Sequence, residues 1–127
     1  MGSLSTVRQP APDAARVLST AAVRAAEFLG VNQTTLAGCL GVSAATVSRM
    51  AKGGYLLDPA RKEWELAALF VRLFRALESI VGGNDESART WLAGDNLGLG
   101  DKPVRLIRTA EGLVRVVQYL DAARGRV

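Results

Sequence analysis

The residue types that most often carry out catalysis are nearly absent from this sequence. Its 127 residues include no histidine and one cysteine, Cys39. Without histidine, the chain lacks the commonest general base and the commonest metal ligand. A single thiol cannot form an internal disulfide or a zinc site, which favours a reducing, cytoplasmic compartment. Because Cys39 lies among Leu36, Ala37 and Leu40, we expect it to be a small buried apolar side chain. The sequence therefore predicts no catalytic residue, metal or cofactor.

Residues 33–53 indicate a different kind of chemistry, because small, hydroxylated and basic side chains alternate there with apolar ones. Gly41 lies where a tight turn between two short helices needs a left-handed backbone. Ser43 has the right spacing to cap the second helix by accepting a hydrogen bond from the Thr46 amide. The apolar positions of both helices are expected to point inward. This pattern predicts a helix-turn-helix unit, whose second helix can lie in the DNA major groove.

The outer face of that second helix carries the candidate DNA-binding side chains. Small residues permit close approach to a groove, and Arg49 can form a bidentate contact to guanine or clamp a phosphate. Gln33, at the start of the first helix, can reach a phosphate. The predicted DNA-binding residues are Gln33, Thr34, Ser43, Ala45, Thr46, Ser48, Arg49 and Lys52. The alternative is an ordinary helical hairpin whose polar face is simply solvated.

The charge distribution agrees with an anionic partner. The formal net charge is +4, a modest excess that many proteins without a nucleic-acid partner share. Its placement is more informative, since no Asp or Glu occurs between residues 31 and 57. A phosphate backbone would meet no like charge along this stretch.

Helical periodicity and turn residues organise the rest of the chain. The sequence predicts a flexible arm at residues 1–12, followed by helices at residues 13–29, 33–40, 44–52, 59–81, 85–92, 103–108 and 110–120. No segment has the alternation of a strand, so the predicted fold class is all-α. The longest apolar run, 66–71, is far too short to cross a membrane. We expect a DNA-binding domain at residues 13–56 and a second helical domain at residues 57–127.

Two of these helices have broad apolar faces. In the first, Val17, Ala21 and Phe28 share one stripe and form the expected apolar face. In the helix at residues 59–81, which begins with Pro59, apolar side chains cover most of the circumference. A short chain cannot easily bury such a helix on all sides, and this favours a helix shared between two subunits. The sequence therefore predicts a homodimer.

The helix-turn-helix resembles that of the Xre/Cro-type repressors, and the second half of the chain narrows the resemblance. It looks like the toxin-binding domain of the Xre/MbcA/ParS antitoxins, where a Trp-Leu pair precedes an asparagine-leucine loop, a proline-started short helix and a final helix with a glycine. The matching residues are Trp91, Leu92, Asn96, Leu97, Gly98, Lys102, Pro103, Leu106, Thr109, Gly112 and Leu120. The resemblance covers about residues 14–127, with degenerate spacing in the second motif. The glycine-rich stretch 96–100 departs from the family and gives little indication of the toxin.

The resemblance implies an antitoxin that binds a RES-domain toxin, an enzyme that depletes NAD⁺, and represses the shared operon. The toxin-binding residues would be Trp91, Asn96, Leu97, Lys102, Arg105, Arg124, Arg126 and Val127. The loop at residues 94–101 is long enough to be an exposed binding surface, although a tryptophan placed like Trp91, after a two-glycine turn, is most often a core residue. The tail from Arg124, beyond the last helical turn, either enters an anionic-substrate pocket of the toxin or supplies cations to a helix C-terminus.

Two other functions fit the sequence. One is a free-standing helix-turn-helix repressor whose second half only dimerises or senses a ligand. The other is a protein-interaction module with a decayed helix-turn-helix. The antitoxin interpretation predicts a non-enzymatic, cytoplasmic protein whose partners are operator DNA, a toxin and a second copy of the chain, with no membrane. A toxin-sized reading frame beside the gene would favour it.

Overall fold

The structure, a computed structural model, describes residues 12–125 and folds them into helices. In chain order these are α1 (Pro12–Leu29), α2 (Gln33–Leu40), α3 (Ala44–Ala51), α4 (Lys62–Val81), α5 (Asp85–Ala93), α6 (Pro103–Leu106) and α7 (Ala110–Arg124). Over this range the one β-type pairing is an isolated bridge between Asn96 and Asp101. The all-α prediction is confirmed. Residues 1–11, nearly all of the predicted arm, lie outside the described residues.

The first helix, α1, buries its small side chains. Ala22, Ala25 and Leu29 belong to the core, whereas Val17 is 67% exposed and Phe28 is 48% exposed. The predicted apolar face of this helix is therefore wrong. Alanine lacks the bulk that holds two helices apart, so an alanine face allows close packing, and the larger side chains are left outside.

The turn between α2 and α3 has the predicted local structure. Gly41 has a φ of +71°, in the left-handed region, and the Ser43 Oγ accepts a hydrogen bond of 3.0 Å from the Thr46 amide. In addition, the Asn32 side chain caps α2 by accepting a hydrogen bond of 2.8 Å from the Thr35 amide. Each cap satisfies a backbone donor that has no partner inside its helix. The relative placement of α2 and α3 is therefore fixed by local chemistry.

The central helix, α4, begins at Lys62, so the prediction that Pro59 starts it is wrong. Asp58 builds a turn instead of a cap: its side-chain Oδ1 accepts a hydrogen bond of 2.9 Å from the Ala60 amide, and its carbonyl accepts one of 3.0 Å from the Arg61 amide. A short Asp side chain stabilises this kind of turn readily. The helix then starts without a side-chain cap, and Glu63 in its first turn complements the helix dipole.

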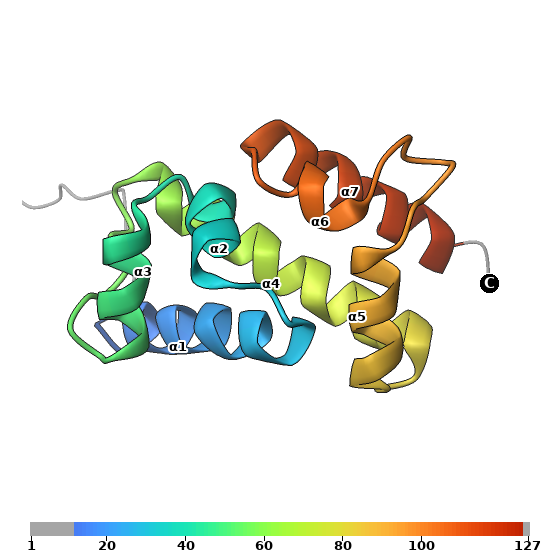
Figure 1. The fold of residues 1–127 in the computed structure, drawn as a ribbon. Helices are drawn as coiled ribbons and strands as arrows, with labels where there is room; N and C mark the ends of the chain where they lie inside the picture. The colour runs from blue at the N-terminus through green and yellow to red at the C-terminus, as the bar shows by residue number, and fades with distance from the viewer. Residues whose placement is uncertain (1–11, 126–127) are drawn as a thin grey trace, which may run out of the picture.

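The two halves of the chain share one core, and α4 lies at its centre (Figure 1). This helix packs against α1, α2, α5 and α7. Its side chains Phe70, Leu73 and Leu77 are fully buried, within the same cluster as Leu36 of α2 and Leu113 of α7. The two halves therefore do not have separate cores, because their buried apolar side chains form one cluster.

Glycine allows the backbones of the two halves to meet. A Cβ on Gly38 of α2 would lie 2.7 Å from the carbonyl oxygen of Arg108, in the turn that precedes α7. Within the second half, a Cβ on Gly112 would overlap the carbonyl group of Leu106, so α6 and α7 also approach closely. Side chains at these positions would push the segments apart. The helix-turn-helix thus rests directly on the C-terminal part of the chain.

The last helix, α7, starts as predicted but runs further than predicted. The Thr109 Oγ1 accepts a hydrogen bond of 3.1 Å from the Gly112 amide. The helix continues to Arg124 instead of ending near Leu120, so the expectation that Arg124 lies beyond the last turn is wrong. Two alanines favour the extra turn, and Asp121 pairs with Arg124 across it at 3.6 Å.

Candidate functional sites

Helix α3 separates an apolar inner face from a polar outer face. Val47 and Met50 are buried in the core. On the opposite side, Ala45, Arg49 and Lys52 are exposed, and the predicted hydroxyl-bearing residues Thr46 and Ser48 are half-buried. The small and basic side chains that sequence analysis assigned to DNA therefore do face outward.

The hydroxyl groups at the start of α3 already have partners within the protein. The Ser43 Oγ caps the helix and also lies 2.9 Å from the Thr46 Oγ1. Either hydroxyl can donate in this pair, and each keeps a lone pair or a proton for an external group. Their position is fixed by the cap, so they are held in place before any ligand arrives.

The remaining predicted contacts lie at the start of α2. Asn32 is the N-cap, and Gln33 and Thr34 follow it with exposed side chains. The free amides of a helix N-terminus favour a phosphate group. The predicted DNA-binding residues thus lie in α2, in α3, in the turn between them and, for Lys52, directly after α3, which lies at one end of the molecule in Figure 1.

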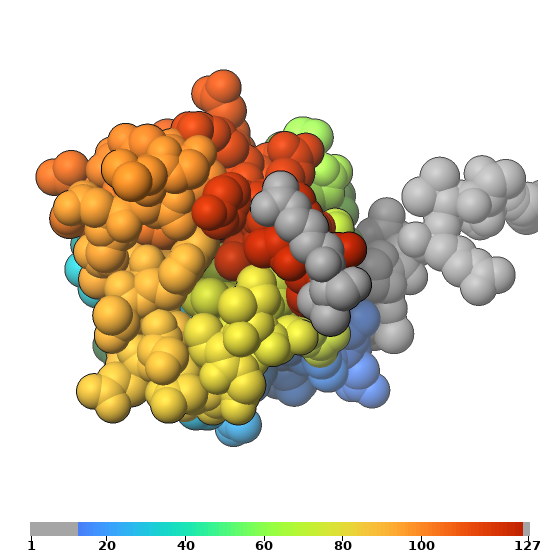
Figure 2. Space-filling model, turned by 90° about the vertical axis from the view of Figure 1, so that its right-hand side faces the viewer, coloured from blue at the N-terminus to red at the C-terminus, as the bar shows by residue number. Residues whose placement is uncertain are grey.

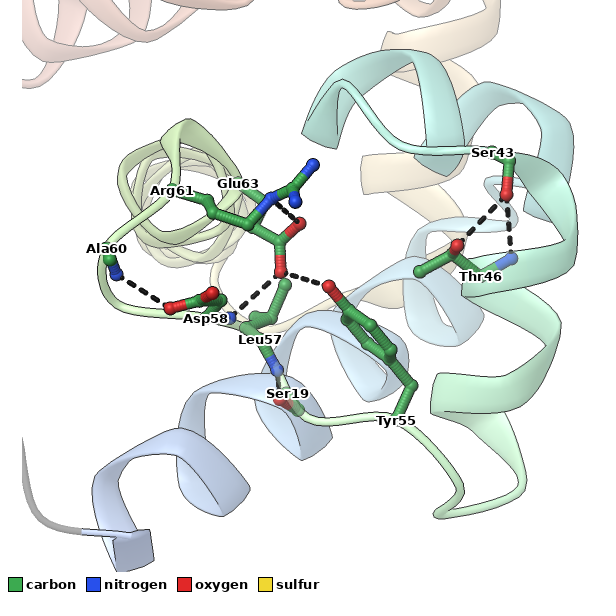
Figure 3. A network of polar contacts seen from close by, with 9 residues as sticks. All are labelled: Ser19, Ser43, Thr46, Tyr55, Leu57, Asp58, Ala60, Arg61 and Glu63. Atoms are coloured by element: carbon green, nitrogen blue, oxygen red, sulfur yellow. Dashed lines mark hydrogen bonds and ion pairs between the residues drawn. The ribbon is translucent and has the colours of Figure 1, made fainter.

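A polar network beside α3 was not predicted from the sequence (Figure 3). Glu63 is buried, with 3% of its surface exposed. Its Oε2 accepts hydrogen bonds from the Tyr55 hydroxyl at 2.6 Å and from the Asp58 amide at 2.9 Å. The bond to Glu63 raises the pKa of Tyr55 above its ordinary value. Nearby, the buried Ser19 Oγ accepts a hydrogen bond of 2.9 Å from the Leu57 amide. These bonds tie the segment after α3 to α1 and α4.

A second exposed feature is the loop between α5 and α6, residues 94–102, which we call the Leu97 loop. This loop closes on itself through hydrogen bonds. The Asn96 side chain accepts a hydrogen bond of 3.0 Å from the Leu99 amide, and its carbonyl accepts one of 2.8 Å from the Gly100 amide. Arg115 of α7 donates a bond of 2.7 Å to the Leu99 carbonyl. Leu97, at the tip, is left 100% exposed. An apolar side chain held out in this way is a candidate contact for another protein.

An aromatic pair supports this loop. The rings of Trp91 and Tyr119 stack with their centroids 6.3 Å apart. Trp91 is half-buried, Tyr119 is exposed, and a Cβ on Gly98 would lie 2.9 Å from the Tyr119 ring. Trp91 therefore serves partly as a support and partly as surface. In Figure 2, α5 and the following loop lie beside α7 on one face. Tyr119 was missed because its contact with Trp91 joins distant parts of the chain.

The predicted basic residues of this region are paired with carboxylates. Lys102 lies 2.8 Å from Asp95, and Arg105 lies 3.4 Å from Asp101. A hydrogen bond from the Lys102 amide lowers the pKa of Asp101, and the positive charge of Arg105 lowers it further. These exposed pairs contribute little to stability. Their presence makes the rim of the loop mixed in charge.

The predicted tail divides into a described part and a part outside the described residues. Arg124 lies in the last turn of α7 and pairs with Asp121, whose carboxylate also pairs with Arg72 of α4. This position matches the alternative of a cation at a helix C-terminus. Arg126 and Val127 lie outside the described residues, and their predicted role stays a prediction.

Residues 12–125 contain no group of His, Cys, Asp and Glu arranged to hold a metal ion. No helix in this range is long and apolar enough to cross a membrane.

Comparison with protein-family models finds a match in each half. Residues 8–72 match the antitoxin Xre-like helix-turn-helix domain, which is more than half of the chain. Residues 76–126 match the antitoxin Xre/MbcA/ParS C-terminal toxin-binding domain. No curated protein matches the chain. The first match contains the α2–α3 unit, and the second contains the Leu97 loop. The chain therefore belongs to the Xre family of antitoxins, with a helix-turn-helix domain followed by an Xre/MbcA/ParS toxin-binding domain.

Proposed function

We propose that this antitoxin neutralises a RES-domain toxin, which depletes NAD⁺, and represses its own operon, binding both partners without catalysis of its own. The observation that carries the proposal is the separation of two exposed regions of unlike chemistry. The polar, basic face of α3 lies at one end of the molecule, and the Leu97 loop lies towards the other (Figure 1). One chain can therefore hold DNA and a toxin at the same time.

Operator binding is assigned to the outer faces of α2 and α3. Arg49 and Lys52 supply positive charge, and the small Ala45 leaves room for the wall of a groove. The stretch between residues 31 and 57 has no acidic residue to repel a phosphate. Base contacts and phosphate contacts are then made from the same rigid unit.

Toxin binding is assigned to the Leu97 loop and its surroundings. A fully exposed leucine on a hydrogen-bonded loop resembles the apolar anchor of a protein interface. Trp91 and Tyr119 extend the apolar area, while Lys102 and Arg105 lie at its polar rim. The RES identity of the toxin rests on the family resemblance alone.

We also propose that two copies associate through the groove between α1 and α4. This groove has a volume of about 490 Å³ and a mostly apolar lining that includes Val17, Val71 and Arg75. One face of α4 carries four residues that are three or four positions apart, as helical spacing requires: Glu65, Ala68, Arg72 and Arg75. A two-fold axis across the middle of α4 would bring Glu65 near Arg75 of the second copy. Such an interface would cover the exposed Val17.

Light scattering on the purified chain tests the dimer. The wild type is expected at twice the monomer mass, and Val17→Asp at the monomer mass. An unchanged dimer in Val17→Asp would exclude this groove as the interface.

The central test is co-expression with the product of the neighbouring gene. The proposal predicts that this product alone lowers cellular NAD⁺, that the antitoxin restores it, and that the two proteins copurify. It also predicts lower expression from the upstream DNA when the antitoxin is present. A neighbour that leaves NAD⁺ unchanged would contradict the RES assignment, and unchanged expression would contradict autorepression.

A further inference from the structure

Tyr55 connects the exposed Arg49 of the recognition helix with the buried Glu63 of α4. The Arg49 Cζ lies 5.5 Å from the centroid of the Tyr55 ring, which places the guanidinium over the face of the ring. At its other end, the Tyr55 hydroxyl donates a hydrogen bond of 2.6 Å to the Glu63 Oε2 (Figure 3). The ring is therefore anchored by both its backbone and its hydroxyl.

The anchor itself is rigid. Glu63 lies in the first turn of α4. Its carboxylate also accepts a hydrogen bond from the Asp58 amide and forms an ion pair with Arg61 at 3.5 Å. The Leu57 amide, just after Tyr55, donates to the buried Ser19 of α1. Burying a carboxylate is unfavourable unless it has such partners. The result is a fixed aromatic platform beside an exposed recognition helix.

A platform of this kind matters for arginine in particular. A free arginine side chain samples many rotamers, and fixing it on binding costs conformational entropy. Stacking uses the flat face of the guanidinium and leaves its in-plane N–H groups free for a base edge or a phosphate. Arg49 remains exposed in the stacked position.

We propose that Tyr55 is a positioning residue for DNA recognition: anchored by Glu63, it holds the Arg49 guanidinium ready to contact DNA. This inference rests on the proposed DNA-binding function. It assigns to the segment between α3 and α4 a role beyond connecting the two helices.

Duplex binding by the full chain tests the proposal, with a duplex from upstream of its gene and a scrambled duplex of equal length and composition. Tyr55→Leu is expected to weaken binding to the upstream duplex by about two- to fivefold, the size of an exposed cation–π contact. Tyr55→Phe keeps the ring but not its anchor and is expected to fall in between. Leu56→Ala, in the same segment, is the matched control.

A double-mutant cycle separates positioning from mere structure. In an Arg49→Ala background, Tyr55→Leu should cause no further loss for the upstream duplex. The same loss in both backgrounds, or no loss in either, would overturn the proposal. If the wild type does not prefer the upstream duplex to the scrambled one, the proposed DNA-binding function itself fails, and that outcome is distinct.

Arginine side-chain NMR gives a readout without DNA. The ring current of Tyr55 should shift the Arg49 side-chain resonances upfield, and Tyr55→Leu should remove that shift while Tyr55→Phe retains part of it. Thermal unfolding of each variant checks folding. If Tyr55→Leu does not fold, Tyr55→Phe decides by the same criteria. Arg49 resonances that are identical in the wild type and the variant would contradict the stacking on which the proposal depends.

Discussion

The α2–α3 unit and the loop between α5 and α6 expose different chemistry by different means. In α3, packing of Val47 and Met50 into the core orients a face of small and basic side chains. In the loop, hydrogen bonds to Asn96 and from Arg115 hold one apolar side chain, Leu97, in solvent. The first surface suits a polyanion with a repeating shape, and the second suits a pocket on a protein.

This difference shows how one small core can serve two partners. Both regions rest on α4 and on the same apolar cluster, so neither needs a core of its own. Because the exposed groups lie in different parts of the fold, a substitution at one surface should leave the other surface intact. The following predictions test that independence, from the largest expected effect to the smallest.

Leu97→Asp should have the largest effect. Placing a carboxylate at an apolar anchor should weaken toxin binding about 100-fold, near 3 kcal/mol, while DNA binding stays unchanged. Isothermal titration with the copurifying toxin measures the loss. Leu56→Asp, at another exposed leucine, is the control. Full affinity in Leu97→Asp would remove the loop from the toxin interface.

Arg49→Ala should show the reverse selectivity. Loss of one arginine contact to a base or phosphate should weaken binding to the upstream DNA about tenfold, or 1.4 kcal/mol, with toxin binding unchanged. Fluorescence anisotropy at one fixed salt concentration measures it, because salt alters the electrostatic part. Arg16→Ala, an exposed arginine of α1, should bind DNA normally. Equal affinities of Arg49→Ala and wild type would exclude Arg49 from the site.

Gly38→Ala probes the junction on which the two regions depend. The new methyl group would meet the Arg108 carbonyl, and overpacking should outweigh the better helix propensity of alanine. We expect a net loss of about 1 kcal/mol in the free energy of unfolding, in one cooperative transition. Gly54→Ala, where a Cβ meets only ordinary contacts, is the control in denaturant titrations. Two separate unfolding transitions would contradict a shared core.

The ionisation of Cys39 should give the smallest effect near neutral pH, because its contribution appears only at alkaline pH. Burial raises the pKa of its thiol from 9.0 to about 12. The native thiol therefore stays protonated where the unfolded one ionises, so the stabilising difference is complete below pH 9 and is lost as the pH rises towards 12. Between pH 8 and pH 10 the wild type should lose about 1.4 kcal/mol more than Cys39→Ala. The comparison with Cys39→Ala is needed because the pKa of Tyr55 is also raised, and both proteins contain Tyr55. Equal losses would show that the thiol is accessible in the native state.

Features with local causes were predicted well from the sequence. The Gly41 turn and the Ser43 cap each depend on one residue and its near neighbours. The family resemblance was recognised for the same reason, since its motifs follow the chain.

Features that depend on packing between distant segments were predicted poorly. The apolar stripe with Val17 and Phe28 looked like a core face, but only the position of α4 shows that the alanines are buried. In the sequence alone, Glu63 looks like a solvated charge. Its burial depends on hydrogen bonds from the Tyr55 hydroxyl and the Asp58 amide, which only the folded structure places beside it. The end of α7 is a different case, because Gly125 directly follows Arg124 and is a local signal for a helix C-terminus that was overlooked.

The most direct test of the account is a reciprocal comparison of Leu97→Asp and Arg49→Ala in both assays. The account predicts that Leu97→Asp binds the upstream DNA like the wild type and fails to restore NAD⁺ in cells that express the toxin. It predicts that Arg49→Ala restores NAD⁺ and binds the DNA weakly. A single variant that loses both activities while remaining folded would contradict the claim that this antitoxin holds its two partners on separate surfaces.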